Sequence, residues 1–354
     1  MNKKAIVTTW LFKTGLSNLN AGEGSSNLTE IKTYGKDNLP YISGQSVRHS
    51  LRKAIKRQNK EGFKCTVEFP CTDIKNCWLC DIFGYLAPEN AEKRWSPIKV
   101  SPALGQIKEP ITTDMLLRLA GNIECPNCEE KFNPMASDDA EGKKDYPRGQ
   151  NIECPKCGEK FEAPYHIRQA LAHKQLIENT YKASVSIDIE ALGKEEVPDI
   201  EGEGDEATIK GINYTEKYDD EERRKRVKSI LKGISNLSDF AAQAREMTNA
   251  SPDLILISLQ EEYNHRLSSA LNLNKEGKID EETLKAVIKD VIEIPNTVIF
   301  AGFTPGGLEV SQKNVLEILD ELNDGYEDSP IKFGTKEEPL TPRQAIKKAI
   351  EKVD

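Results

Sequence analysis

The stretch Pro40–Gly62, "PYISGQSVRHSLRKAIKRQNKEG", joins a short extended segment to a basic helix. A serine just before a helix can accept a hydrogen bond from the backbone of its first turn, so Ser43 predicts a helix from Gly44 to about Gln58. Apolar residues at helical spacing predict the buried stripe of this helix: Val47, Leu51, Ala54 and Ile55.

The predicted helix carries five positive charges and no acid: Arg48, Arg52, Lys53, Lys56 and Arg57. One interpretation is an ordinary solvated face. The other is a phosphate site, because helix N-termini attract anions. The N-terminal residues Ser43, Gly44, Gln45 and Ser46 would then approach a phosphate closely, and Arg48 could bind it with two hydrogen bonds.

The sequence before and after this stretch predicts strands interleaved with helices. Alternating or continuous apolar residues predict strands at Lys3–Phe12, Ala183–Leu192 and Leu254–Leu259. Helices are expected at 164–178, 280–291 and after the Thr341–Pro342 pair, and residues 297–319 read as strand, glycine loop and helix. The chain therefore predicts an α+β fold.

The composition indicates large exposed insertions. The chain has 354 residues, more than one compact core usually needs, and only 37% of them are hydrophobic. The net charge of −9 gives no general affinity for nucleic acid, so any such site must be a local patch. Residues 190–222 are acidic and predict an exposed arm. No stretch is long enough for a membrane span, and the opening apolar run is too short for a signal peptide. We expect a cytoplasmic protein without a membrane partner.

A short cysteine phrase occurs twice, as "NIECPNCEEKF" (Asn122–Phe132) and "NIECPKCGEKF" (Asn151–Phe161). Two C-x₂-C turns can close one tetrahedral zinc site, and the Lys-Phe pair that follows each turn suits the return strand of a hairpin. The predicted ligands are Cys125, Cys128, Cys154 and Cys157. Because four thiolates leave no open position, we expect a structural rather than a catalytic zinc.

The other four cysteines stand in "CTVEFPCTDIKNCWLC", at Cys65, Cys71, Cys77 and Cys80. This spacing is less standard. A second closed zinc site with four cysteine ligands is expected, while an iron–sulfur cluster and simple buried thiols remain alternatives.

Four segments in this order, "YISGQSVRHSLR", "CDIFGYL", "KRWSPIKVSPAL" and "FAAQAREMTNASP", resemble the DevR-type branch of the RAMP superfamily. The resemblance covers most of the chain, from Lys3 to about Glu309, whereas the repeated zinc knuckles are not part of the core pattern. Proteins of this branch are backbone subunits of type I CRISPR Cascade effector complexes.

The resemblance implies a ferredoxin-like, RRM-related palm formed by residues 1–62 and 181–354. It also implies a fingers insertion at 63–180 and a thumb hairpin within 190–235. The two cysteine groups lie in the fingers insertion, so this part is expected to be cross-linked by zinc. The expected partners are CRISPR RNA, neighbouring copies stacked head to tail, other Cascade subunits and the target DNA strand.

Several residues outside the helix are expected to contact RNA. Uncharged donors in the loop after the first strand can bind phosphate or ribose hydroxyls, and Lys99 is a weaker candidate. The resemblance adds a second RNA-contacting segment. The full candidate set is Asn18, Asn20, Asn27, Ser43, Gly44, Gln45, Ser46, Arg48, Arg52, Lys53, Lys99, Gln243 and Arg245.

We expect no enzymatic activity, because no adjacent acid and base are visible in the sequence. The alternative is a RAMP-type endoribonuclease, which cuts either target RNA or precursor CRISPR RNA. Its candidate groups are His49, on the basic helix, and Asp37, in the loop before it. A zinc-ribbon regulator that binds DNA is a third class, but the acidic knuckles argue against it.

Overall fold

The computed structural model describes residues 3–20, 28–90, 92–118, 121–134, 145–168, 170–202, 208–240, 247–326 and 328–353. It divides into two compact units. The first comprises Met1–Ala21, Ile31–Pro110 and Ile177–Asp354, and the second comprises Gly22–Glu30 and Ile111–Leu176. No helix in the described ranges is both long and apolar enough to cross a membrane.

A mostly antiparallel sheet forms the centre of the first unit. Its middle strand is β1 (Ala5–Ser17), which pairs with β16 (Ala170–Asp188) on one side and with β19 (Leu254–Gln260) on the other. The strand β20 (Val298–Phe303) pairs with β19, and β21 (Ile331–Lys332) lies parallel to β20. Beyond β16 lie β7 (Ile98–Val100), β8 (Ala103–Gly105), β4 (Leu39–Ile42) and β3 (Thr33–Tyr34).

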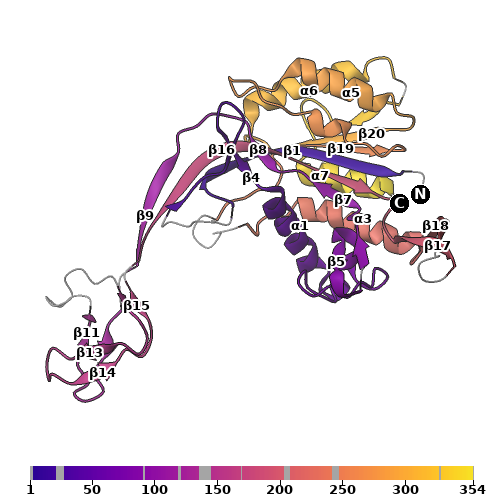
Figure 1. Ribbon diagram of the computed structural model, residues 1–354. Coiled ribbons are helices and arrows are strands. Elements are labelled where there is room, and N and C mark those ends of the chain that lie inside the picture. Colours follow the sequence, from indigo (N-terminus) through magenta and orange to yellow (C-terminus); the bar gives the residue numbers. More distant parts are fainter. Residues whose placement is uncertain are drawn as a thin grey trace. The chain divides into compact units, whose positions relative to one another are not determined.

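Helices cover both faces of this sheet (Figure 1). On one face lie α1 (Gly44–Gln58), α3 (Asp220–Ile234) and α7 (Pro342–Val353). On the other lie η6 (Arg266–Ser269), α5 (Glu281–Ile292) and α6 (Glu309–Asn323). Successive side chains of a strand point to opposite faces. Ile6 and Trp10 of β1 therefore pack in the core beneath α1, α3 and α7, and Val7 and Leu11 pack in the core beneath η6, α5 and α6.

Short elements follow α1 in the chain. They are η1 (Lys60–Gly62), α2 (Trp78–Phe83), β5 (Tyr85–Ala87), η2 (Pro88–Asn90) and β6 (Glu92–Arg94). A separate hairpin consists of β17 (Lys194–Glu201) and β18 (Thr208–Glu216). Every residue of β18 is exposed, so the hairpin is an arm that the core does not cover.

The second unit is built from short hairpins. The pairs are β10 (Ile123–Glu124) with β11 (Lys131–Phe132), β12 (Asp145–Tyr146) with β15 (Ile167–Arg168), and β13 (Asn151–Glu153) with β14 (Lys160–Glu162). In addition, β9 (Thr112–Arg118) and β2 (Leu28–Thr29) pair with the first part of β16. Among the described residues of this unit, the buried apolar cluster comprises Ile123, Tyr146, Ile152, Ala163 and Ile167. So small a core needs additional cross-links.

The predicted α+β class is confirmed, as are the capped helix at 44–58 and the strands at 254–259 and 297–303. The predicted helix at 164–178 is wrong, because residues 167–168 and 170–178 are strands. Ala, Leu, Lys and Gln favour a helix locally, but pairing of β16 with β9 overrides that preference. The palm, fingers and thumb boundaries remain a prediction.

Candidate nucleic-acid interface and metal centres

The N-terminus of α1 is held by a small polar cluster. The Ser43 hydroxyl accepts a hydrogen bond from the Ser46 backbone N–H at 3.2 Å, which confirms Ser43 as the cap. The Asn20 amide accepts from the Ser43 N–H at 2.9 Å and donates to the Tyr41 carbonyl at 2.8 Å. Asn18 is buried and accepts from the Asn20 N–H at 3.3 Å. The structure thus gathers four predicted residues (Asn18, Asn20, Ser43 and Ser46) at one helix end.

These side chains are largely engaged with the protein itself. The Ser46 hydroxyl, for example, donates to the Leu19 carbonyl at 2.7 Å. Helix geometry leaves the N–H groups of Gly44 and Gln45 without an intrahelical acceptor, and the first turn contains no acid. A β-carbon added to Gly44 would lie 3.3 Å from the Val100 carbonyl oxygen, so α1 packs closely on the β7–β8 connection. What this helix end can offer an anion is therefore backbone N–H groups.

Arg48 is engaged with the protein rather than fully exposed. Its guanidinium donates to the Phe83 carbonyl and, at 3.4 Å, to the Ile98 carbonyl, and it lies 5.1 Å from the centre of the Phe83 ring. Burial, aided by the nearby charge of Arg52, lowers the pKa of Arg48. The side chain ties α1 to α2 and β7, and its role as a phosphate ligand remains a prediction.

The other predicted cations are more accessible. Lys53 is exposed on α1, and Lys99 is exposed on β7, where its amino group donates to the Ser96 carbonyl at 2.9 Å. The Arg52 guanidinium lies 3.0 Å from Nδ1 of His49. Three further predicted contacts, at Asn27, Gln243 and Arg245, lie outside the described residues.

His49 lies among cations on α1. Partial burial, followed by the charges of Arg52 and Lys53, lowers its pKa and so favours the neutral imidazole. His166 and His173 belong to the second unit, whereas His49 belongs to the first. His49 contacts Arg52, and within the described ranges no hydrogen bond joins its ring to a carboxylate.

The first cysteine group forms a compact cluster of four thiols. The Sγ atoms of Cys65 and Cys77 lie 3.5 Å apart, as do those of Cys65 and Cys80, and Cys71 lies 3.7 Å from Cys80. Thiolates bound tetrahedrally to zinc at about 2.3 Å are separated by about 3.8 Å. All four sulfurs lie within 4.8 Å of one another, so the cluster fits one metal ion.

Two thiols of this cluster have pKa values shifted in opposite directions. A hydrogen bond from Cys80 lowers the pKa of Cys77, and the same bond together with burial raises the pKa of Cys80. A metal ion would replace the remaining thiol protons.

The second group closes in the same way, with one knuckle facing the other. The Sγ atoms of Cys125 and Cys157 lie 3.7 Å apart, and so do those of Cys128 and Cys154. The two knuckles match in detail. The Glu129 N–H donates to the Cys125 carbonyl at 3.0 Å, and the Gly158 N–H donates to the Cys154 carbonyl at 2.9 Å. The Lys-Phe pairs form the return strands of the two hairpins.

Sequence reasoning missed a buried polar network beside the first cluster. Asp81, which directly follows Cys80, is completely buried and contacts Arg94, Arg226 and Tyr218. Its sequence signal was an acid inside the apolar run "WLCDIF". Arg226 belongs to "RRKRVK", which reads as a surface charge run, yet its side chain is only 1% exposed.

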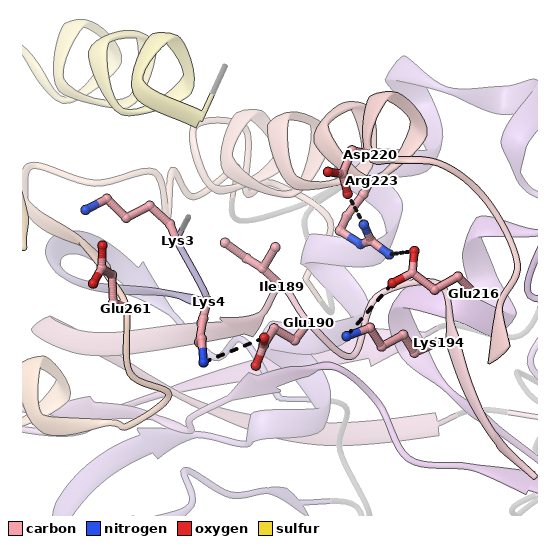
Figure 2. Close-up of a pocket in the computed structure, with 9 residues that line it drawn as sticks. All are labelled: Lys3, Lys4, Ile189, Glu190, Lys194, Glu216, Asp220, Arg223 and Glu261. Carbon is pink, nitrogen blue, oxygen red and sulfur yellow. Dashed lines mark hydrogen bonds and ion pairs between the residues drawn. The ribbon is translucent and has the colours of Figure 1, made fainter. Parts of the chain in front are cut away.

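A cavity of about 490 Å³ lies beside the start of β1 and the base of the β17–β18 hairpin (Figure 2). Opposite charges pair along its wall: Lys4 with Glu190 at 3.8 Å, and Lys194 with Glu216 at 4.0 Å. The charges of this lining therefore largely neutralise one another.

The family model described as CRISPR-associated negative auto-regulator DevR/Csa2 matches residues 50–117 and 166–282, slightly more than half of the chain. The chain belongs to the DevR/Csa2 family. The DevR/Csa2 match includes the first four-cysteine cluster. The unmatched residues 118–165 contain the second cluster, in agreement with the predicted position of the knuckles outside the family pattern.

Two solved structures are similar over the whole chain. One is titled "CRISPR RNA-guided surveillance complex, pre-nicking", with 10% identity, a TM-score of 0.55 and coverage of 99% of this chain and 100% of that chain. The other is titled "CRISPR RNA-guided surveillance complex", with 11% identity, a TM-score of 0.49 and the same coverage. The first supports the fold of this DevR/Csa2 member. None of the curated proteins matches.

Proposed function

We propose that this chain is a backbone subunit of a CRISPR surveillance complex that binds CRISPR RNA through its first unit. The observation that carries the proposal is membership of the CRISPR-associated DevR/Csa2 family. The similarity to a chain of a surveillance complex at a TM-score of 0.55 supports the matching fold.

In this proposal the sheet built on β1, β16 and β19, with α1 and α3 on one face, is a ferredoxin-like palm. The exposed β17–β18 hairpin falls inside the predicted thumb at 190–235. Copies stack head to tail along the guide RNA, together with other Cascade subunits, and present its bases to the target DNA strand. The complex acts in the cytoplasm.

Guide RNA must be bound without regard to sequence, so the contacts fall on phosphate and ribose. The N-terminus of α1 supports such a role, because it offers backbone N–H groups, a positive helix dipole and no acid in its first turn. Gln45, Lys53 and Lys99 provide exposed side chains, whereas Arg48 and Arg52 reach the RNA only if they exchange their present partners.

The two four-cysteine clusters are proposed to bind structural zinc through Cys65, Cys71, Cys77 and Cys80, and through Cys125, Cys128, Cys154 and Cys157. Zinc supplies a cross-link in each case, since four thiolates fill its coordination shell. The subunit is proposed to have no catalytic activity.

RNA binding is tested by measuring affinity for guide RNA as a function of salt. Each phosphate contact on a single strand contributes about −0.7 to the slope of log affinity against log salt. The double variant Lys53→Ala/Lys99→Ala removes two exposed charges, so its slope should be flatter by about 1.4 if both contact phosphate. The double variant Arg48→Ala/Arg52→Ala tests the two engaged arginines.

Lys348→Ala, on the exposed face of α7, is the matched control and should leave the slope unchanged. An unchanged slope in both test variants would show that neither these three α1 side chains nor Lys99 contact phosphate. The same mixtures, incubated with labelled guide and target RNA, distinguish a scaffold from the ribonuclease alternative. Regularly spaced cuts in target RNA, or precursor cleavage that disappears in His49→Ala, would overturn the non-catalytic proposal.

A further inference from the structure

The carboxylate of Asp81 joins elements that are far apart in the sequence. Its Oδ1 accepts hydrogen bonds from Arg94 at 2.6 Å and from the Gly193 N–H at 3.0 Å. Its Oδ2 accepts from the Tyr218 hydroxyl at 2.6 Å and from Arg226 at 2.7 Å. Four donors therefore converge on one buried carboxylate, which immediately follows the cluster residue Cys80.

Two of these donors belong to the base of the β17–β18 hairpin, with one on each side. Gly193 directly precedes β17, and Tyr218 follows β18 by two residues. The Lys217 N–H also donates to the Gly193 carbonyl at 2.9 Å. Gly193 has a φ of +74°, and a β-carbon there would lie 2.4 Å from the Tyr218 ring, so only glycine fits. Both ends of the hairpin thus converge at Asp81.

Arg94 strengthens the same connection from β6. Besides Asp81, its guanidinium donates to the Lys194 carbonyl at 2.6 Å and to the Ala191 carbonyl at 2.8 Å. The residues that lead into the hairpin are therefore fixed by one arginine whose position depends on Asp81.

Arg226 connects the network to the cysteine cluster itself. Its guanidinium donates to the carbonyls of Ile74 at 2.9 Å and Lys75 at 2.7 Å, in the loop between Cys71 and Cys77. It also lies 4.0 Å from the centre of the Tyr218 ring. The loop between two cluster cysteines and the hairpin base thus share one arginine.

A second set of contacts at the hairpin base lies nearer to solvent. Figure 2 shows Glu216 between Lys194 and Arg223, at 4.0 Å and 3.1 Å respectively. Both Lys194 and Glu216 have substantial exposure, so salt weakens their attraction. The contacts to Asp81 are buried, so salt weakens them less than the Lys194–Glu216 pair.

The placement of Asp81 depends in turn on the cluster. It lies in α2, which has six residues, and so short a helix has little stability of its own. Cys77 occupies the N-cap position of this helix and Cys80 lies within it, so a metal bound to all four cysteines would fix α2 to residues 65 and 71.

We propose that the first four-cysteine centre is a metal-dependent clamp on the β17–β18 hairpin. Bound metal fixes α2, α2 fixes Asp81, and Asp81 holds both ends of the hairpin. The inference concerns the isolated chain and does not require RNA. If the hairpin is the thumb of the proposed function, metal occupancy also controls how well this arm is oriented for a neighbouring copy.

The experiment is hydrogen–deuterium exchange of the full chain without RNA, with zinc bound and after removal by a chelator. Loss of metal from the first centre should speed exchange of the Gly193 and Lys217 amides at least about tenfold, because the contacts that restrain this base are released. Exchange in β19, inside the main sheet, should stay the same. Re-addition of zinc should restore protection.

Two variants separate the two centres, and a third tests Asp81 itself. Cys65→Ser/Cys71→Ser should reproduce the effect with one zinc lost, and Cys125→Ser/Cys128→Ser should lose one zinc without changing exchange at the hairpin base. Asp81→Asn should keep the zinc content but release the base. If it does not fold, the chelator experiment on the unaltered chain decides. Unchanged exchange after loss of the first metal, or equal loosening of β19, would overturn the clamp, whatever the outcome of the RNA experiments.

Discussion

The carboxylate of Asp81 is fully buried, and its stability there depends on the hydrogen-bond donors that surround it. A buried charge is tolerated only when donors replace the water it has lost, and here two guanidinium groups, a hydroxyl and a backbone N–H do so. Burial, followed by the Asp81 charge, raises the pKa of Tyr218, which keeps that hydroxyl protonated as a donor. Removing one partner of such a network typically costs about 3–5 kcal/mol.

Glu129 and Gly158 occupy equivalent positions in the two knuckles. Both have left-handed backbones, with φ of 57° for Glu129 and 71° for Gly158. A side chain in this conformation costs about 1–2 kcal/mol relative to glycine. Alanine also lowers the conformational entropy of the unfolded chain, which offsets part of this cost. We therefore expect Gly158→Ala to lower the stability of the second unit by about 1 kcal/mol. The measurement is the chelator concentration at which the second centre loses zinc.

Glu129→Gly is the matched variant in the other knuckle. It should be neutral or slightly stabilising, because glycine adopts the left-handed backbone conformation of Glu129 without strain. A β-carbon at Gly158 meets nothing within 4 Å, so the comparison isolates the backbone effect from packing. Equal stability of Gly158→Ala and the unaltered chain would contradict the argument.

Among the elements, α1 combines a stability role with a proposed binding role at the same end. The Ser43 cap satisfies a backbone donor of the first turn. Ser43→Ala should lower the free energy of unfolding by about 1 kcal/mol, because that donor loses its acceptor. Chemical denaturation of the isolated chain measures this change.

Ser43→Asp separates the two roles of this helix end. Aspartate is also a good cap, so stability should stay close to that of the unaltered chain. Its negative charge would oppose a phosphate, so guide-RNA affinity should fall by about tenfold or more. Unchanged affinity in a stable Ser43→Asp chain would mean that phosphate does not bind at this helix end.

At the scale of the whole molecule, each of the two compact units contains one of the four-cysteine clusters. We expect two zinc ions per chain by elemental analysis. Cys125→Ser/Cys154→Ser should lose one zinc and, with it, on the order of 10 kcal/mol of local folding energy, so the small second unit unfolds. The main sheet should remain folded, because its core consists of other residues.

Limited proteolysis tests this independence. In the double variant, cleavage should begin between residues 111 and 176, while the first unit survives as a protected product. A second unit that stays resistant to protease without its metal would contradict a structural role for that zinc.

The sequence was sufficient to predict features that depend on residues close together in the chain. The cap at Ser43, the apolar stripe of α1 and the alternation around Val185 and Ile187 follow from helical and strand periods. The grouping of Cys125, Cys128, Cys154 and Cys157 was equally predictable, because two turns of fixed length can bring four sulfurs within reach of one ion.

Only the tertiary structure decided features that depend on partners distant in the chain. Residues 170–178 became a strand because β9 and β1 supply the hydrogen-bonding edges, which helix propensity cannot anticipate. Arg48 and Arg226 belong to basic runs of similar appearance, yet carbonyl and carboxylate acceptors from other elements draw both inward. The sequence determined which residues can cap, alternate or bind metal, whereas long-range packing determined which charges were buried.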